Sequence, residues 1–383
     1  MSSRGFRPDR LPMVPAPRRG EALPSWLGAV ARLYGAGQGS ALTRVGLDAG
    51  PGRRRSVNRL KSYSYWLTAQ EADRVCAATG VRREAAMGMT LRRVLESAVQ
   101  SGDALERPYA RGDFEPRALR RFFVFRNTVN VCPACLKAGP GVRWPWFWYF
   151  QYAVLCPVHY CYLLSACPGC GEGFHPADFA AGPWACRRAV ASPDWPRKEE
   201  GRTPCRATLA DLRARWSRDQ VLIDAQQRLF LLLTADEDTW RAKRGLFGDL
   251  CTLYIFAWLY VVPEELAGAD REVVRALEKF LAAGYRSYRL GIWKGGGRTR
   301  DHYLRAAFVR VAGQAVFSQD VPAAVEQLGR RWPQKKFAVV FASYSKNALV
   351  QGTERLDALL EASTSAYCLE SVRRWRAHHA LGW

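Results

Sequence analysis

Apolar residues recur at helical spacing near the start of the chain. A stretch rich in proline and arginine, residues 10–19, comes first and cannot hold a helix, because proline lacks the backbone N–H that helical bonding needs. Behind it, apolar side chains stand three or four positions apart: Leu23, Trp26, Leu27, Val30 and Leu33. This periodicity predicts an amphipathic helix over residues 21–34, ended by Gly35.

Two short helices are predicted over residues 68–88. Thr68 and Glu71 have the spacing of a capping box, in which each side chain bonds a free backbone amide at the start of a helix. Gly80 marks a tight turn behind that helix, and a second helix is predicted from Arg82. This order is typical of a helix-turn-helix, whose second helix contacts DNA. An ordinary helical hairpin explains the pattern equally well.

The remaining apolar pattern is mainly helical as well. Helices are predicted within residues 91–126 and, further on, at 217–233, 249–260, 271–283, 303–311, 321–330, 347–361 and 366–378. The first of the later group is introduced by a second capping box at residues 217–220. One strand candidate, residues 337–341, has no evident partner. The apolar run at residues 250–262 is too short to span a bilayer and indicates a buried helix.

Eight of the eleven cysteines lie in the block of residues 132–205, most of them at metal-ligand spacing. Zinc takes four sulfur or nitrogen ligands, and a gap of two residues lets one turn supply two of them. The first predicted zinc site is a Cys3His set made by Cys132, Cys135, Cys156 and His159. The second is made by Cys167, Cys170, Cys186 and Cys205, with His175 as the alternative fourth ligand. Cys161 is out of register with both and is interpreted as a packed thiol.

The run of aromatic residues at positions 143–152 separates the ligands of the first predicted site. Small zinc modules have little core of their own, so these rings are expected to pack the metal-binding turns against neighbouring helices. A surface on which nucleic-acid bases stack is the alternative interpretation.

Composition and length set the number of domains. The chain has 383 residues, more than one core usually supports, and its 48% hydrophobic and 12% aromatic content excludes global disorder. We therefore expect a mainly α protein with three parts. They are an N-terminal basic helical domain with the helix-turn-helix (residues 1–128), a central tandem zinc-finger region (129–208) and a C-terminal helical domain (209–383).

The net charge of +22 predicts a polyanionic partner. Residues 1–131 hold 23 lysines and arginines against 11 acidic residues, so this third of the chain carries an excess of 12 out of 22. A coding bias toward arginine is the alternative explanation, although the uneven distribution favours a binding surface. The predicted nucleic-acid contacts are Arg53, Arg54, Arg55, Lys61, Arg82 and Arg83.

Several protein classes are disfavoured. The first residues lack the apolar core of a signal peptide, and Cys-x-x-Cys pairs are too close to be ordinary disulfides, which favours a reducing cytoplasm. A full Cys3His set leaves no position for catalytic water, and no His-x-Glu precedes the cysteine pairs as in a deaminase. Residues 294–298 are glycine-rich but lack the ending of a phosphate loop. The acidic residues 236–238 could bind a metal but are better explained as a solvated helix end. We expect a protein that is not an enzyme.

The order of these motifs resembles the TniQ family of bacterial transposon target-site selectors, which includes TnsD. The resemblance rests on residues 21–27 (Glu-Ala-Leu-Pro-Ser-Trp-Leu), on the Cys-Pro-x-Cys and Cys-x-x-His pairs and on the second Cys-Pro-x-Cys. Ala22 departs from the serine of the family's opening motif. Ala189 stands where the family often has a cysteine partner of Cys186, which indicates an insertion before Cys205.

The resemblance implies a non-enzymatic cytoplasmic adaptor that marks a target site for DNA transposition and recruits the transposon's AAA+ regulator. Some family members bind target DNA directly, and others dock on an RNA-guided CRISPR effector such as Cascade, in some systems as a dimer. The implied partners are therefore DNA or a guide-RNA complex, the AAA+ regulator and a second copy of the chain, with no membrane. A zinc-containing transcription regulator that binds a specific DNA sequence is the alternative.

Overall fold

The computed structural model describes residues 10–47, 63, 66–92, 129–138, 143–171, 173–174, 186, 189–191, 202–205, 207–208, 211–282 and 301–318. The described residues up to Trp216 form one compact unit, and those from Ser217 onward form a second. The chain is mainly helical, as predicted, with one short two-stranded sheet. Each unit is described by itself, and the predicted division into three domains stays a prediction.

The first unit opens with two helices that share a core. Helix α1 (Leu23–Leu33) places Trp26 and Leu27 against helix α2 (Gln38–Arg44), and the side chains of both residues are fully buried. Gly35 follows α1 with a φ of +59°, in the left-handed region that glycine adopts without strain. The amphipathic helix predicted here is confirmed, with bounds two residues inside the expected start and one inside the expected end.

The predicted pair of short helices is present as α4 (Ala69–Thr79) and α5 (Arg83–Gly88). Thr68 and Glu71 form both bonds of the capping box: the Glu71 N–H donates to Thr68 Oγ1 at 3.2 Å, and the Thr68 N–H donates to Glu71 at 2.9 Å. Gly80 ends α4 in the left-handed conformation. The helix-turn-helix interpretation of this pair and its role in binding stay predictions.

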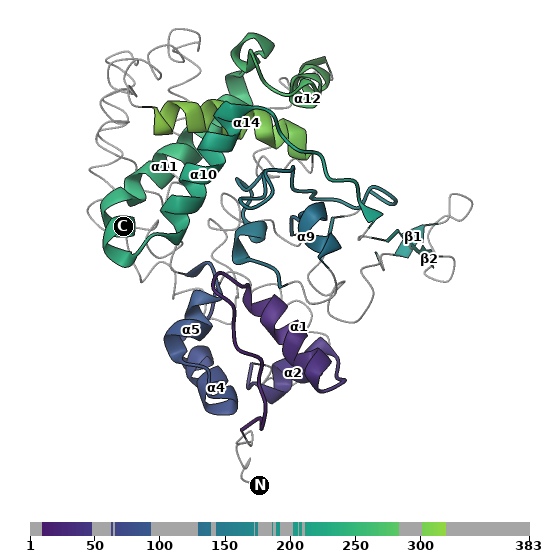
Figure 1. The fold of residues 1–383 in the computed structure, drawn as a ribbon, viewed down its shortest axis with the longest axis vertical. Coiled ribbons are helices and arrows are strands. Elements are labelled where there is room, and N and C mark those ends of the chain that lie inside the picture. Colours follow the sequence, from purple (N-terminus) through teal and green to yellow (C-terminus); the bar gives the residue numbers. More distant parts are fainter. Residues whose placement is uncertain are drawn as a thin grey trace, which may run out of the picture. The chain divides into compact units, whose positions relative to one another are not determined.

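The cysteine-rich part of the first unit is built from short elements. They are helix α9 (Pro133–Lys137), the 3-10 helix η2 (Trp146–Tyr149) and the antiparallel strands β1 (Ala189–Ala191) and β2 (Arg202–Pro204) (Figure 1). The rings of η2 are at most 8% exposed, which confirms that they pack inside the unit and leaves them inaccessible to bases. The strands were not predicted, because three-residue runs carry no readable alternation.

The second unit is a helical bundle around one buried helix. It consists of α10 (Gln220–Thr234), α11 (Glu237–Tyr260), η6 (Pro263–Leu266), α12 (Arg271–Ala282) and α14 (His302–Phe317). Helix α14 packs against α10, α11 and α12 (Figure 1). The approach to α10 is close, because a Cβ added at Gly313 would lie 2.6 Å from the Cβ of Ala225. Apolar side chains therefore surround α14 on several sides.

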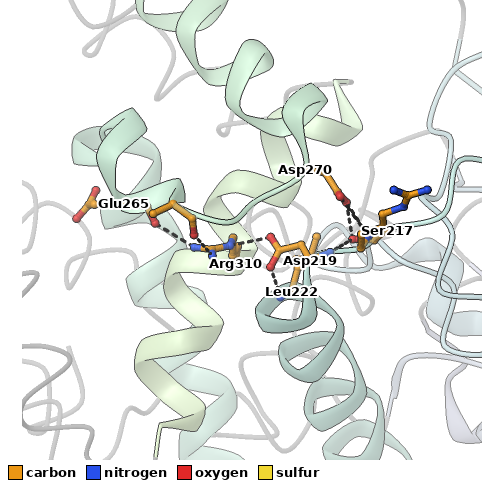
Figure 2. A network of polar contacts seen from close by, with 8 residues as sticks. Ser217, Asp219, Leu222, Glu265, Asp270 and Arg310 are labelled. Atoms are coloured by element: carbon orange, nitrogen blue, oxygen red, sulfur yellow. Dashed lines mark hydrogen bonds and ion pairs between the residues drawn. The ribbon is translucent and has the colours of Figure 1, made fainter.

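A buried polar network connects the bundle's loops, as Figure 2 shows. Arg310 of α14 donates from Nε to the Asp219 carboxylate at 2.7 Å, from one terminal nitrogen to the Glu265 carbonyl at 3.0 Å and from the other to the Ala267 carbonyl at 2.8 Å. Beside it, Ser217 Oγ donates to the Asp270 carboxylate at 2.6 Å. Arg310 thus joins α14 to the start of α10 and to the loop before α12.

Two predictions at helix starts need correction. The capping box expected at residues 217–220 is wrong, because Asp219 caps α10 by accepting from the Leu222 N–H, while Ser217 bonds Asp270. Helix α11 begins at Glu237 rather than near residue 249, and α14 extends to Phe317. The acidic residues 236–238 lie at a helix end, as the sequence analysis expected. Asp236 accepts a hydrogen bond from the Thr239 N–H at 2.8 Å.

Several sequence predictions fall on residues that are not described. They are the helices at 321–330, 347–361 and 366–378, the strand at 337–341, the glycine-rich turn at 294–298 and nearly all of 91–126. None of the helices in the described part of the chain combines the length and the apolar character needed to cross a lipid bilayer.

Candidate metal centres

The first two ligands stand at the start of helix α9. Cys132 is the N-cap residue, and its Sγ accepts a hydrogen bond from the Cys135 N–H at 3.3 Å. Pro133 opens the helix, where its fixed φ is favourable and its missing N–H costs nothing. The turn thereby brings both sulfur atoms to one end of the helix.

The second pair is held by a tight turn instead of a helix. The Tyr160 N–H donates to the Cys156 carbonyl at 2.8 Å, and the Cys156 N–H donates to the Cys161 carbonyl at 2.9 Å. Tyr160 has a φ of +52°, the one positive φ of a non-glycine residue in the described part of the chain. The turn directs Cys156 and His159 toward the same side.

Backbone pairing between distant segments brings the two turns together. Val131 and Leu164 exchange both of their N–H to carbonyl bonds, at 2.8 and 2.9 Å, so the strand-like residues before Cys132 lie beside those that follow His159. Asn130 supports this arrangement from inside, because its side-chain amide donates to the carbonyls of Phe150 and Ala153. The predicted first group of four ligands is therefore assembled in space.

The distances within the first group fit a tetrahedral metal ion. Nδ1 of His159 lies 3.6 Å from Cys132 Sγ, 3.3 Å from Cys135 Sγ and 3.6 Å from Cys156 Sγ, and the sulfurs of Cys135 and Cys156 are 3.8 Å apart. Bond lengths of about 2.3 Å to sulfur and about 2.0 Å to nitrogen put neighbouring ligand atoms ~3.5–3.8 Å apart around tetrahedral zinc. These four residues could therefore hold a metal ion, and their spacing is consistent with zinc.

The thiols of this group cannot ionise independently. The pKa of Cys132 is far below its usual range, first because the Cys135 thiol donates a hydrogen bond to it, and then because Cys156 and Cys161 do the same. The pKa of Cys135 is raised, chiefly by its hydrogen bond to Cys132, and the pKa of Cys156 is raised to about 11, mainly by the same neighbour. The three thiols are therefore coupled through their mutual hydrogen bonds, and a bound divalent metal would favour the ionised form of each ligand.

The second group is assembled by a similar turn and by the β1–β2 hairpin. Gly171 follows Cys170 with a φ of +68°, and its N–H donates to the Cys167 carbonyl at 2.7 Å. Beyond it, Ala189 pairs with Pro204, and in the same register the Cys186 N–H donates to the Ala207 carbonyl at 2.9 Å. The hairpin returns the chain, so that Cys205 arrives beside Cys186 even though eighteen residues separate them in the sequence.

The sulfur distances of the second group also fit a metal ion. Cys167 and Cys205 are 3.9 Å apart, and Cys170 and Cys186 are 3.8 Å apart, close to the ~3.8 Å expected around tetrahedral zinc. All four ligand atoms lie within 4.8 Å of one another. Cys205 thus stands in the fourth position, and the alternative ligand His175 lies outside the described residues.

Cys161 lies beside the first group without joining it. Its side chain is buried, and its Sγ lies 3.4 Å from Cys132 Sγ, but it does not belong to the set of four mutually close ligand atoms. This agrees with its interpretation as a packed thiol. Because Cys161 is buried in contact with a ligand sulfur, it also helps to shape the site.

The predicted nucleic-acid contacts are only partly described. Arg82 and Arg83 are exposed at the start of α5, and Arg83 forms an ion pair with Asp73 of α4 at 3.4 Å. Such an exposed pair contributes little to stability and leaves the guanidinium accessible. Arg53, Arg54, Arg55 and Lys61 lie outside the described residues, so the structure does not bring them together with the other two.

Two features of the first unit were missed in the sequence. Glu21 is 2% exposed and accepts two hydrogen bonds from Arg143 at 2.8 and 2.9 Å, while Ser25 Oγ donates to Glu21 and accepts from the Trp144 N–H. The opening motif therefore attaches α1 to the aromatic run beside the first metal group. The second feature is an exposed basic and aromatic segment that ends at Trp216. The sequence did not indicate it, because the tertiary fold decides which of its side chains are exposed.

These features define a helical protein in which two four-ligand cysteine groups organise a compact unit. Residues 12–163 match the family model described as TniQ, so this part of the chain carries a TniQ domain. The matched residues include the whole first ligand group and the Glu21–Arg143 pair, whereas the second group lies beyond them. None of the curated proteins compared with the chain matches it.

The strained turn at Tyr160 makes a prediction about stability. We expect Tyr160→Gly to stabilise the metal-loaded protein by ~0.5–1 kcal/mol, because relief of a left-handed backbone (roughly 1–2 kcal/mol) outweighs the extra chain entropy of glycine (roughly 0.5–1 kcal/mol). Tyr160→Ala keeps the strain and should not stabilise. Thermal denaturation of both variants measures the difference, and equal melting temperatures for the two variants would contradict the prediction.

Proposed function

We propose that this protein is a zinc-containing adaptor, without enzymatic activity, that selects the target site for DNA transposition and recruits the transposon's AAA+ regulator. The observation that carries the proposal is the TniQ match over residues 12–163, which includes a complete set of metal ligands. Target selection by such an adaptor depends on contacts with nucleic acid and with partner proteins.

The metal proposed for both groups is zinc. Thiolate sulfur and imidazole nitrogen at tetrahedral spacing are the donor set that zinc prefers in structural sites. The first group would be held by Cys132, Cys135, Cys156 and His159, and the second by Cys167, Cys170, Cys186 and Cys205. Four protein ligands in each group leave no open position for water, which supports a structural role for the metals. When bound, zinc supplies charge that keeps the thiolates ionised.

Nucleic-acid contact is proposed for the basic N-terminal part of the chain. Arg82 and Arg83 lie exposed at the start of the second helix of the α4–α5 pair, the position from which a helix-turn-helix contacts DNA. Arg53, Arg54, Arg55 and Lys61 would add to this surface. The partner is either target DNA itself or the guide-RNA complex of a CRISPR effector such as Cascade, and a cytoplasmic homodimer is compatible with both modes.

Sequencing of insertion sites tests the proposed function. In cells that carry the transposon genes, omission of this protein should abolish insertion at the normal target site, and Arg82→Ser with Arg83→Ser should lower it. The purified chain should also form a complex with the transposon's AAA+ ATPase. An unchanged distribution of insertions without the protein, together with regulation of a nearby promoter, would instead support the transcription regulator.

A further inference from the structure

An exposed surface lies beside the first metal group, and none of its side chains belongs to the set of four ligands. We define the knuckle surface as Val158, Tyr160, Arg213, Arg215 and Trp216. Val158 is 71% exposed, Tyr160 is 37% exposed and Trp216 is 62% exposed, and both arginines are exposed as well. Three apolar or aromatic side chains and two cations therefore face solvent from two neighbouring segments.

Backbone pairing places these two segments side by side. Cys161 and Trp216 form an antiparallel bridge, and the Tyr162 N–H donates to the Arg215 carbonyl at 2.8 Å. The segment that ends at Trp216 alternates, since Leu212 and Ala214 are buried and the arginines between and after them are exposed. One side of this extended segment thus packs into the unit, and the other side presents guanidinium groups to solvent.

The exposure of Trp216 is unusual within this protein. Every other tryptophan whose side chain the structure describes is at most 8% exposed. Tyr160 is also unusual, because its backbone is left-handed. The equivalent position in the turn of the second group is occupied by a glycine, Gly171. Strained residues persist where surrounding structure or function requires the side chain, so the Tyr160 ring is a candidate for a functional group.

The knuckle surface carries two positive charges that no carboxylate of the described residues neutralises. Within the described residues, no carboxylate forms an ion pair with Arg213 or Arg215, and Asp211, the acidic residue of the same segment, is itself exposed. Two free guanidinium groups beside exposed rings match a strand of nucleic acid, in which phosphates alternate with flat bases. A protein partner would need carboxylates at the same spacing.

We propose that the knuckle surface binds an unpaired strand of nucleic acid, with bases stacked on Trp216 and Tyr160 and phosphates bound by Arg213 and Arg215. A duplex fits less well, because its bases are already stacked on each other and present no free face to a ring. The inference rests on the proposed function only for the source of the strand, which an opened target or a guide RNA would supply. The binding itself depends on this surface alone.

Fluorescence anisotropy with the zinc-loaded full chain tests the inference. The probes are fluorescein-labelled dT20, the corresponding U20 RNA and a 20-base-pair duplex. Because a stacked base is worth on the order of tenfold in affinity, Trp216→Ala should weaken binding of both single strands by about tenfold. Tyr160→Gly should weaken it in the same direction while the fold is retained or stabilised, which separates loss of the ring from loss of structure.

Salt dependence separates the two kinds of contact. The slope of log affinity against log salt is about −0.7 for each phosphate that a single strand contacts, so Arg213→Ser with Arg215→Ser should reduce it by about 1.4. Trp216→Ala should leave the slope unchanged. Arg44→Ser, at an exposed arginine of α2, and Leu231→Ala, at an exposed apolar residue of α10, are the matched controls and should leave the affinity for single strands within twofold of wild type.

The outcomes distinguish this inference from the proposed function. Unchanged affinity and salt slope in the Trp216 and arginine variants would overturn the inference, whether or not the AAA+ complex forms. Loss of binding to the AAA+ regulator with single-strand affinity intact would also overturn it and would assign the surface to a protein. Loss of single-strand affinity in these variants supports the inference even if insertion sites prove independent of the chain, in which case the proposed function alone fails.

Discussion

Replacing Cys132 with alanine is expected to reduce the zinc content from two ions per chain to one and to unfold the part of the first unit that surrounds the site. Structural zinc contributes about 10–16 kcal/mol of binding free energy in small zinc domains, which equals or exceeds the roughly 5–15 kcal/mol by which a whole domain is stable. Loss of one of four ligands therefore removes more stability than the unit has in reserve. Elemental analysis gives the metal content, and near-ultraviolet circular dichroism reports on the buried aromatic run.

Two matched cysteine variants serve as controls for this experiment. Cys76→Ser changes a half-buried thiol of α4, and Cys161→Ser changes the buried thiol beside Cys132; neither residue belongs to a ligand group. Both variants should retain two zinc ions. Cys186→Ala should lose one ion from the second group and leave the first intact. A Cys132→Ala protein that kept two zinc ions and its aromatic dichroism would refute a structural zinc in the first group.

The second large effect is expected at Arg310. Arg310 and Asp219 are 4% and 1% exposed, and their 2.7 Å ion pair joins α14 to the start of α10. Arg310→Met should destabilise the second unit by about 3–5 kcal/mol, because it leaves the Asp219 carboxylate buried without its cation and two carbonyls without donors. Urea denaturation measures the loss, and hydrogen exchange of α10 and α14 should locate it in the second unit.

The effect of Arg310→Met should depend on pH. Burial raises the pKa of Asp219, and the nearby Arg310 opposes that increase, so removal of the arginine should raise the pKa further. A carboxyl group whose pKa is raised in the folded state destabilises the fold least when it is protonated. As the pH rises through that pKa the buried group ionises, and the folded state loses stability. The variant should therefore be less destabilised relative to wild type at pH 5 than at pH 8.

A second substitution and a surface control make this prediction specific. Asp219→Asn added to Arg310→Met removes the unpaired charge and keeps an amide oxygen that can cap α10, so it should recover part of the lost stability. Arg275→Met, at an exposed position of α12, should change stability by less than about 0.5 kcal/mol. Equal destabilisation by Arg310→Met at both pH values would show that the loss comes from packing and not from the buried charge.

Sequence reasoning succeeded where a feature is local. Helix α1, the Thr68–Glu71 capping box and the Gly80 turn each depend on residues within about four positions, and all three are confirmed. It failed at the start of α10, because Ser217 lies near enough to Asp270, more than fifty residues away, to bond it instead of the helix. Asp219 then took the capping position. Local helix propensity takes no account of a hydrogen-bond partner that only the tertiary fold brings close.

The ligand groups illustrate both sides of this division. Spacing of two residues is enough to identify each half-site, because one turn of backbone carries both ligand atoms. Which half-sites combine, and whether Cys205 or His175 comes fourth, depends on where the chain returns. The β1–β2 pairing brings Cys205 beside Cys186, although neither three-residue strand is recognisable in the sequence.

By itself, the sequence determined the mainly helical class, the TniQ resemblance and the eight candidate ligands, because each depends on residue type and short spacing. The tertiary structure alone decided that Glu21 meets Arg143, that Asp219 meets Arg310 and that Trp216 remains exposed, while the other tryptophans with described side chains are buried. These relations join residues about 90 to 120 positions apart or depend on what covers a side chain. Burial and long-range charge pairing arise only when the chain has folded, and no local pattern encodes them.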